Sequence, residues 1–233
     1  MCKKFSALYL ITKELVFVPE STDSHEDLID ATFNFPSLKS TDNGNGFVRL
    51  EYCPQDGNYA DIKSYKLHVD QRVRPQWFTD SEEKHVESLL RNRVLQMMII
   101  KSKKVLLGGC YILVGNVNIR NLTNSRIISA GSAIIKDAGF AIIEHAGSAT
   151  IENAESATIK DAGFATIKYA EFATIKYAGS ATIKYAGSAT IKHAGSATIE
   201  HAESATIKYA RSATIKHARS ATIEHAGSAT ITQ

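Results

Sequence analysis

An eight-residue repeat fills the second half of this 233-residue chain and constrains its fold more than any other feature. From Ala130 to Gln233 the sequence divides into 13 copies of the pattern Ala-Gly-Ser-Ala-Thr-Ile-Lys-Tyr, and two degenerate copies, at residues 114–121 and 122–129, precede them. In all 13 copies the first and fourth positions are Ala and the sixth is Ile. Because short repeats bury their apolar side chains by stacking on one another, the pattern predicts a repeat architecture for this half of the chain.

A β-strand explains the repeat, whereas an α-helix does not. In a helix, eight residues turn the chain by about 800°, so the invariant Ile would move around the helix axis from copy to copy. In the copy Ala178–Tyr185, residues 180–184 alternate with a period of two. This alternation predicts a strand in which Ala181 and Ile183 face inward, and Gly179 marks the corner before it.

The amount of apolar side chain favours a thin coil. Each octad contributes only two Ala and one Ile to the interior, which is too little to fill a wide three-sided coil at native packing density. We therefore expect two octads to make one coil, so the 15 octads predict seven and a half coils. The predicted fold is mainly β: a two-sided parallel β-solenoid over residues 114–233, with an N-terminal α+β domain over residues 1–113.

Residues 1–113 show the mixed pattern of a small α+β domain. A hairpin is predicted at residues 7–12 and 15–18, a short helix at 26–31 capped by Ser24, strands at 47–52 and 64–69, and a loop at 36–46. Thr79 to Glu82 form a capping box, and the helix that it opens has one apolar stripe: Val86, Leu89, Leu90, Val94, Met97 and Met98. A solenoid end exposes a strand edge and an apolar interior, so we expect this domain to cap the first coil.

The repeat resembles that of ice-nucleation proteins, a family with a 16-residue β-solenoid repeat whose halves begin Ala-Gly and direct Ser or Thr outward. The resemblance covers Ala130 to Gln233 and implies a solenoid with a water-ordering surface. Ser180 and Thr182 stand where ice-binding arrays favour Thr-x-Thr, and the seventh position adds charge. The chain is also similar to hypothetical phage proteins in which a small N-terminal domain precedes short tandem repeats, notably at Arg74 to Phe78, and this likeness implies no particular activity.

Charge, cysteine content and hydropathy narrow the class of protein. The formal net charge is only +3. Cys2, Cys53 and Cys110 lie at unrelated spacings, which match neither a disulfide framework nor a metal motif, so we expect reduced thiols. Polar residues interrupt residues 5–18, unlike in a signal peptide, and no stretch is long enough to span a membrane. We therefore expect a cytoplasmic protein without a membrane partner.

The sequence contains no motif that indicates catalysis. The recurring Ala-Gly-Ser-Ala lacks the second glycine of a nucleophile elbow and the lysine of a P-loop. His25, His68 and His85 could form a site with the three cysteines, but their spacing does not support it. We expect no enzyme activity, no cofactor and no metal, with an enzyme housed in residues 1–113 as the alternative.

Stacking every second octad places the eighth position in two ladders. One ladder is Tyr169, Tyr185, His201 and His217, and the other is Tyr177, His193, Tyr209 and His225. Aromatic stacks stabilise such rods, and the alternative is that they form a binding strip.

The seventh position adds a row of lysines that could bind a polyanion: Lys160, Lys176, Lys192 and Lys208. Glu144 and Glu224 close this row, and the phosphates of a nucleic-acid strand lie farther apart than its lysines. We therefore do not expect nucleic acid as a partner, and weak polyanion binding through the lysine row is kept as an alternative function.

The last octad ends inside a coil without a polar cap. Its open edge, formed by Ala226, Ser228, Thr230, Ile231 and Thr232, could template another chain, so we expect an end-to-end dimer and leave a further protein partner open. The preferred function is a non-catalytic, phage-like scaffold that associates with itself. The alternative of another class is an ice-binding or water-ordering protein that uses the Ser-x-Thr rows.

Overall fold

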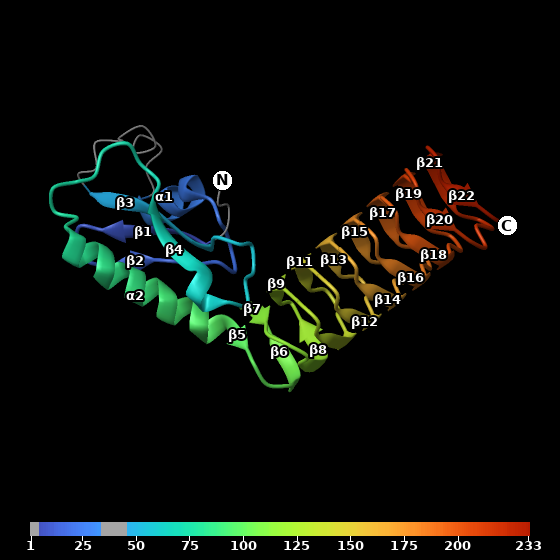
Figure 1. Cartoon of the computed structure of the whole chain (residues 1–233), viewed down its shortest axis with the longest axis horizontal. Helices are drawn as coiled ribbons and strands as arrows, with labels where there is room; N and C mark the ends of the chain where they lie inside the picture. The colour runs from blue at the N-terminus through green and yellow to red at the C-terminus, as the bar shows by residue number, and fades with distance from the viewer. Residues whose placement is uncertain (1–4, 34–45) are drawn as a thin grey trace. The chain divides into compact units, whose positions relative to one another are not determined.

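The computed structural model of the chain describes residues 5–33 and 46–233. By its internal contacts the chain forms two compact units, Met1–Met97 and Met98–Gln233, which Figure 1 shows as a mixed α/β unit and a stack of strands. Cys2 and nearly all of the loop predicted at 36–46 lie outside the described residues.

The first unit contains one antiparallel sheet. Its strand order is β2-β1-β3-β4, with bounds β1 Ser6–Leu10, β2 Leu15–Val16, β3 Phe47–Pro54 and β4 Tyr65–Val69. The other elements are α1 (His25–Phe33), a 3₁₀ turn (Ile62–Ser64) and α2 (Asp80–Met97). The predicted hairpin, both predicted strands and both predicted helices are therefore confirmed.

Both helices begin at the predicted caps. The Ser24 hydroxyl accepts a hydrogen bond from the Asp27 amide at 3.3 Å, and the Thr79 hydroxyl accepts one from the Glu82 amide at 3.4 Å. These bonds satisfy amides that have no partner within the first helical turn. Helix α2 ends at Met97, so Met98, predicted on its apolar stripe, instead begins a strand.

Aromatic side chains fill the core of the first unit. Phe5, Tyr9, Tyr52 and Phe78 are all fully buried, and the rings of Tyr9 and Phe78 meet edge to face at 6.0 Å. Aromatic rings bury much apolar surface each, so a unit of this size reaches a stable core with few of them. In the described part of the chain, no helix combines the length and apolarity needed to cross a membrane.

The second unit is a parallel β-solenoid made of two nine-stranded sheets. One sheet contains β6 Lys103–Leu107, β8 Asn118–Thr123, β10 Ile134–Asp137, β12 Thr150–Asn153, β14 Thr166–Tyr169, β16 Thr182–Tyr185, β18 Thr198–His201, β20 Thr214–Ile215 and β22 Thr230–Ile231. The other contains β5 Met98–Ile99, β7 Cys110–Leu113, β9 Arg126–Ser129, β11 Ile142–His145, β13 Thr158–Asp161, β15 Thr174–Tyr177, β17 Thr190–His193, β19 Thr206–Tyr209 and β21 Thr222–His225. Successive strands alternate between the sheets along the chain (Figure 1).

The strand register confirms two octads per coil. Ile167 pairs with Ile183 in one sheet, and Ile175 pairs with Ile191 in the other, so each residue lies beside the equivalent residue of the second octad after it. The strands begin later than predicted: the representative strand is Thr182–Tyr185, and Ser180 lies in the turn. The cause is Gly179, whose φ of 60° bends the backbone out of the extended conformation just before Ser180.

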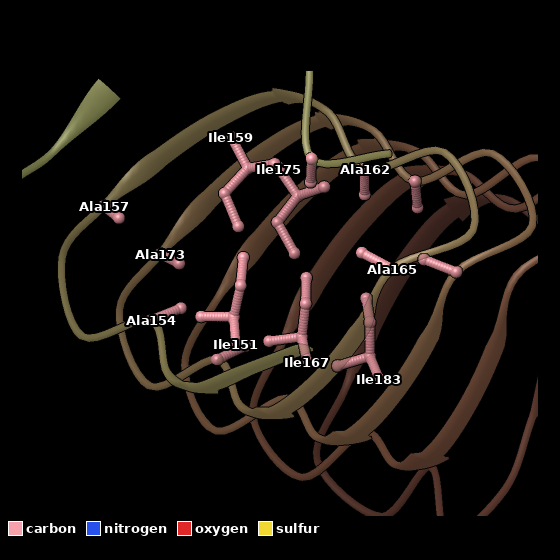
Figure 2. Packing of buried hydrophobic residues seen from close by; sticks show 14 of the residues in the cluster. Ile151, Ala154, Ala157, Ile159, Ala162, Ala165, Ile167, Ala173, Ile175 and Ile183 are labelled. Atoms are coloured by element: carbon pink, nitrogen blue, oxygen red, sulfur yellow. The ribbon is translucent and has the colours of Figure 1, made fainter. Parts of the chain in front are cut away.

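The predicted inward positions form the core of the solenoid. From Ala130 to Ala213 both alanines and the isoleucine of every octad are fully buried. Figure 2 shows Ile151, Ile167 and Ile183 from one sheet pointing toward Ile159 and Ile175 from the other, with alanines at the turns. The small alanines let the two sheets meet at each corner, and the isoleucines fill the space between them.

The coils begin before the clean repeat. Strand β5 pairs with β7, and Leu106 of β6 pairs with Leu122 of β8, so parallel pairing extends back to Met98. The solenoid unit accordingly starts at Met98, one full coil before the boundary expected at residue 114. Strand β6 keeps the 16-residue register of the coil, whereas β5 pairs with β7 at a shorter offset and the pairing of β7 with β9 contains a register shift. The sequence of these strands does not show the octad pattern.

Candidate functional site

From Asp137 to Tyr209 the eighth residue of each octad is the last residue of its strand, where the chain turns into the next sheet, whereas His217 lies two residues after the end of β20. The structure places the two predicted ladders there as continuous stacks. In the first, the ring centroids of Tyr169, Tyr185, His201 and His217 are 5.2, 4.8 and 4.7 Å apart, with planes within 13° of parallel. In the second, the steps through Tyr177, His193, Tyr209 and His225 are 5.0, 5.0 and 4.9 Å. These distances match the strand spacing, so pairing of the strands stacks the rings.

Lysines at the seventh position fold over the tyrosines that follow them. The Nζ atoms of Lys168 and Lys176 lie 5.1 and 5.4 Å from the ring centroids of Tyr169 and Tyr177. Cations over an aromatic face at this distance are attracted by the ring quadrupole. The lysines and the ladders thus form one connected surface on each edge of the rod.

The predicted lysine row follows four neighbouring strands of one sheet. Its members are at the same position of β13, β15, β17 and β19: Lys160, Lys176, Lys192 and Lys208. Both ends of the row are neutralised, because Lys160 contacts Glu144 at 2.7 Å and Lys208 contacts Glu224 at 3.9 Å. Glu144 is nearly buried and also accepts a hydrogen bond from Arg126 at 3.1 Å. This arrangement reduces the field that a polyanion would meet at the ends of the row.

His193 is the ladder residue whose electrostatic environment is most distinctive. Burial lowers the pKa of its imidazole below the ordinary value, and the positive charges of Arg211 and Lys192 lower that pKa further. The ring lies between Tyr177 and Tyr209, and its Nδ1 is buried without a hydrogen-bond partner among the described residues. Both effects favour the neutral form of the His193 imidazole over the charged form.

The predicted association edge lies in the last coil. β21 and β22 are the final strands of the two sheets, and Ala226, Ser228, Thr230, Ile231 and Thr232 are all exposed. Ile231 is 39% exposed, whereas Ile215, one coil earlier at the equivalent position, is fully buried. The structure thus brings these five residues together on an open face, and their role in association stays a prediction.

The first unit contains a polar cluster that the sequence did not reveal. The candidate ligand atoms of His25, Glu51 and Asp70 lie within 4.8 Å of one another. His25 Nδ1 is 3.3 Å from the Asp70 carboxylate, and its Nε2 lies 2.9 Å from the Leu50 carbonyl. Burial, followed by the Asp70 charge, raises the pKa of Glu51. Among the described residues this group could hold a metal ion, although the contacts of the His25 ring with the Asp70 carboxylate and the Leu50 carbonyl already account for its orientation.

The predicted thiol state is only partly supported. Cys110 is buried and is not part of a disulfide, whereas Cys53 is disulfide-bonded, so the expectation that all thiols are reduced is wrong for Cys53. Its unrelated spacing from the other cysteines hid this bond, because a disulfide depends on distance in the fold. His68, which was considered as a possible partner of the cysteines, instead has its Nε2 2.9 Å from the side-chain Nε2 of Gln55.

Comparison with known proteins leaves the assignment to the structure alone. No family model matches the chain, and neither a curated protein nor a solved structure matches it. The likenesses to ice-nucleation repeats and to phage proteins therefore rest on the sequence pattern, and what places the second unit is its observed fold: a parallel β-solenoid with two octads per coil.

Proposed function

We propose that this protein is a non-catalytic scaffold whose solenoid associates with a second copy through its last coil. The observation that carries the proposal is the contrast between equivalent isoleucines, fully buried at Ile215 and 39% exposed at Ile231. In the coils before the last one the same side chain is covered by the next coil. A face that displays both an apolar interior and a strand edge is a ready template for pairing.

A second copy of the same coil would offer this face both backbone hydrogen bonds and apolar side chains. The backbone amides of Thr230 and Thr232 donate to the carbonyls of Ala213 and Ile215, and β22 is the edge strand of its sheet among the described residues. Two such faces related by a two-fold axis would pair their outer strands in antiparallel fashion and cover Ile223 and Ile231 on both sides. The scaffold would then present its aromatic ladders and charged rows twice along one longer rod.

The proposal is tested by measuring the mass of the 233-residue chain in solution by analytical ultracentrifugation. We expect a dimer for the parent chain and a monomer for the double variant Ile223→Lys and Ile231→Lys, because charge would have to be buried in the paired face. Thr198→Lys, on the outer face of β18, is the matched control and should stay dimeric. A monomeric mass for the parent at its highest soluble concentration would refute self-association.

A second candidate function is the ordering of water or ice, and the observation that favours it is the threonine register. Thr150, Thr166, Thr182, Thr198, Thr214 and Thr230 lie opposite one another on successive strands of a single sheet. A regular row of hydroxyls and methyl groups at the strand spacing is a repetitive surface for water. Thermal hysteresis that disappears on changing Thr182 and Thr198 to Lys would support this candidate, and its absence in the parent chain would remove it.

A further inference from the structure

A cationic hollow lies on the outer face of the solenoid near its first coils. Its volume is about 460 Å³, and strands β6, β8, β10 and β12 contribute to its lining together with the segment before β6. Four of the lining side chains are cationic, namely Lys103, Lys104, Arg120 and Lys136, and two are acidic, namely Asp137 and Glu152. The hollow therefore has an excess of positive charge.

Three of these cations form a ladder. Lys104, Arg120 and Lys136 occupy the same position on neighbouring strands, as the flanking pairs of β6 with β8 and of β8 with β10 show. Strand pairing holds their Cα atoms roughly 4.8 Å apart across each step. Three like charges at this spacing repel one another, so the ladder favours a bound anion that neutralises them together.

Carboxylates do not neutralise this ladder as they do the lysine row. Within the described residues no carboxylate oxygen lies within 4.0 Å of Lys104, Arg120 or Lys136, in contrast to Lys160, which contacts Glu144 at 2.7 Å.

The two acids of the hollow have other surroundings. Asp137 accepts a hydrogen bond from the side-chain amide of Asn153 at 2.7 Å, and Glu152 occupies the position equivalent to Lys136 on the next strand, β12. One side of the hollow is thus closed by acid, while the cations of three neighbouring strands stay available.

We propose that this hollow binds a chain of condensed phosphates. Neighbouring phosphoryl groups of such a chain carry their charges close enough together for one ligand to reach all three cations, whereas a single phosphate reaches fewer. Arg120, in the middle, offers a planar guanidinium that can bind two phosphate oxygens at once. Ser102 and Asn118 line the same hollow, and the backbone amide of Asn118 donates a hydrogen bond to the Ser102 hydroxyl at 2.9 Å.

The natural source of the condensed phosphate would be free polyphosphate or the triphosphate of a nucleotide. Titration calorimetry of the full chain at low ionic strength can separate them by using tripolyphosphate, ATP without magnesium, and orthophosphate as probes. We expect saturable binding of tripolyphosphate and at least about tenfold weaker binding of orthophosphate, because fewer charge-assisted contacts form. ATP binding tighter than tripolyphosphate would indicate a nucleotide, and weaker ATP binding would indicate polyphosphate.

Variants locate the site. Arg120→Gln should weaken tripolyphosphate binding about tenfold, which is the typical effect of losing a charge-assisted pair. Lys184→Gln is the matched control, since it removes a cation at the seventh position of the same sheet, outside the hollow, and should leave the affinity unchanged. No saturable binding to the parent chain, or equal weakening by both variants, would overturn the proposal. Because the hollow and the last coil share no residue, this outcome is independent of self-association.

Discussion

The two units of this protein bury apolar side chains in opposite ways. In the first unit a few large residues, among them Tyr9 and Phe78, are each buried in a setting that occurs once. In the solenoid only Ala and Ile recur, and each coil repeats the contacts of the coil before it. Stability is thus concentrated in single side chains in the first unit and distributed over equivalent layers in the second.

The largest expected effect is in the aromatic core. Phe78→Ala should lower the free energy of unfolding of the first unit by about 3–5 kcal/mol, because the deletion leaves a cavity among packed rings. The unit should then unfold at a lower urea concentration than the solenoid, as followed by tryptophan fluorescence of Trp77. Val73→Ala, at a residue that is 54% exposed, is the control and should change little. A similar small change for Phe78→Ala would show that the ring does not anchor this core.

An intermediate effect is expected in the solenoid, and it should depend on the position of the coil. Ile183→Ala should cost about 2–4 kcal/mol, because the side chain is fully buried between two coils. Ile231→Ala makes the same chemical change at a residue that is 39% exposed, and should cost well under half as much. The two values come from urea unfolding followed by circular dichroism, and equal costs would contradict the open last coil.

The smallest effect concerns pH. The pKa of His193 in the folded chain is lowered by burial and by nearby cations. At a mildly acidic pH the His193 imidazole therefore binds a proton more readily in the unfolded chain than in the folded chain. The contribution of His193 to stability is complete above the ordinary pKa of about 6.5 and decreases as the pH falls through it. His193→Tyr keeps the stack with Tyr177 and Tyr209 but removes this titration, so its melting temperature should fall less between pH 7 and 5 than that of the parent.

The control for this variant is Tyr177→Phe, which changes the same ladder without altering a group that titrates between pH 5 and 7. Its melting temperature should follow the pH in the same way as that of the parent. If His193→Tyr also follows the parent, the lowered pKa of His193 does not contribute to stability.

Repetition explains why the solenoid could be predicted from sequence in detail. Because the pattern recurs 13 times, its spacing predicted the inward Ala and Ile. The small volume of these side chains predicted the two-octad coil, and that coil in turn predicted the stacked aromatic ladders. The start of each strand could not, because it depends on the left-handed turn at residues such as Gly179. The strands from Met98 to Leu113 were not predicted, because they pair in the sheets of the solenoid without its octad sequence, and two of them, β5 and β7, also depart from its regular register.

The candidate sites show the same division. The equal spacing of Lys104, Arg120 and Lys136, each two octads from the next, was a usable signal for the cationic hollow, although the first two lie upstream of the clean repeat. His25, Glu51 and Asp70 offered no such signal, because a helix start, a strand and a strand end bring them together only in the folded unit. The period of the sequence predicts which side chains stack on neighbouring strands. It does not predict a cluster whose members come from unrelated elements of the folded unit.

The alternation of octads between the two sheets has a consequence for how such an array can change in length. Gain or loss of a pair of octads adds or removes one coil and leaves every later residue on its own sheet. Gain or loss of a single octad moves everything after it to the opposite sheet, so that Lys208 would leave the lysine row and Tyr209 would join the other ladder. The core would be the same in both cases, because both sheets use Ala and Ile alike. Odd and even changes in copy number would thus leave the core equally well packed. Only an odd change would rearrange the side chains that the solenoid presents on its two outer faces.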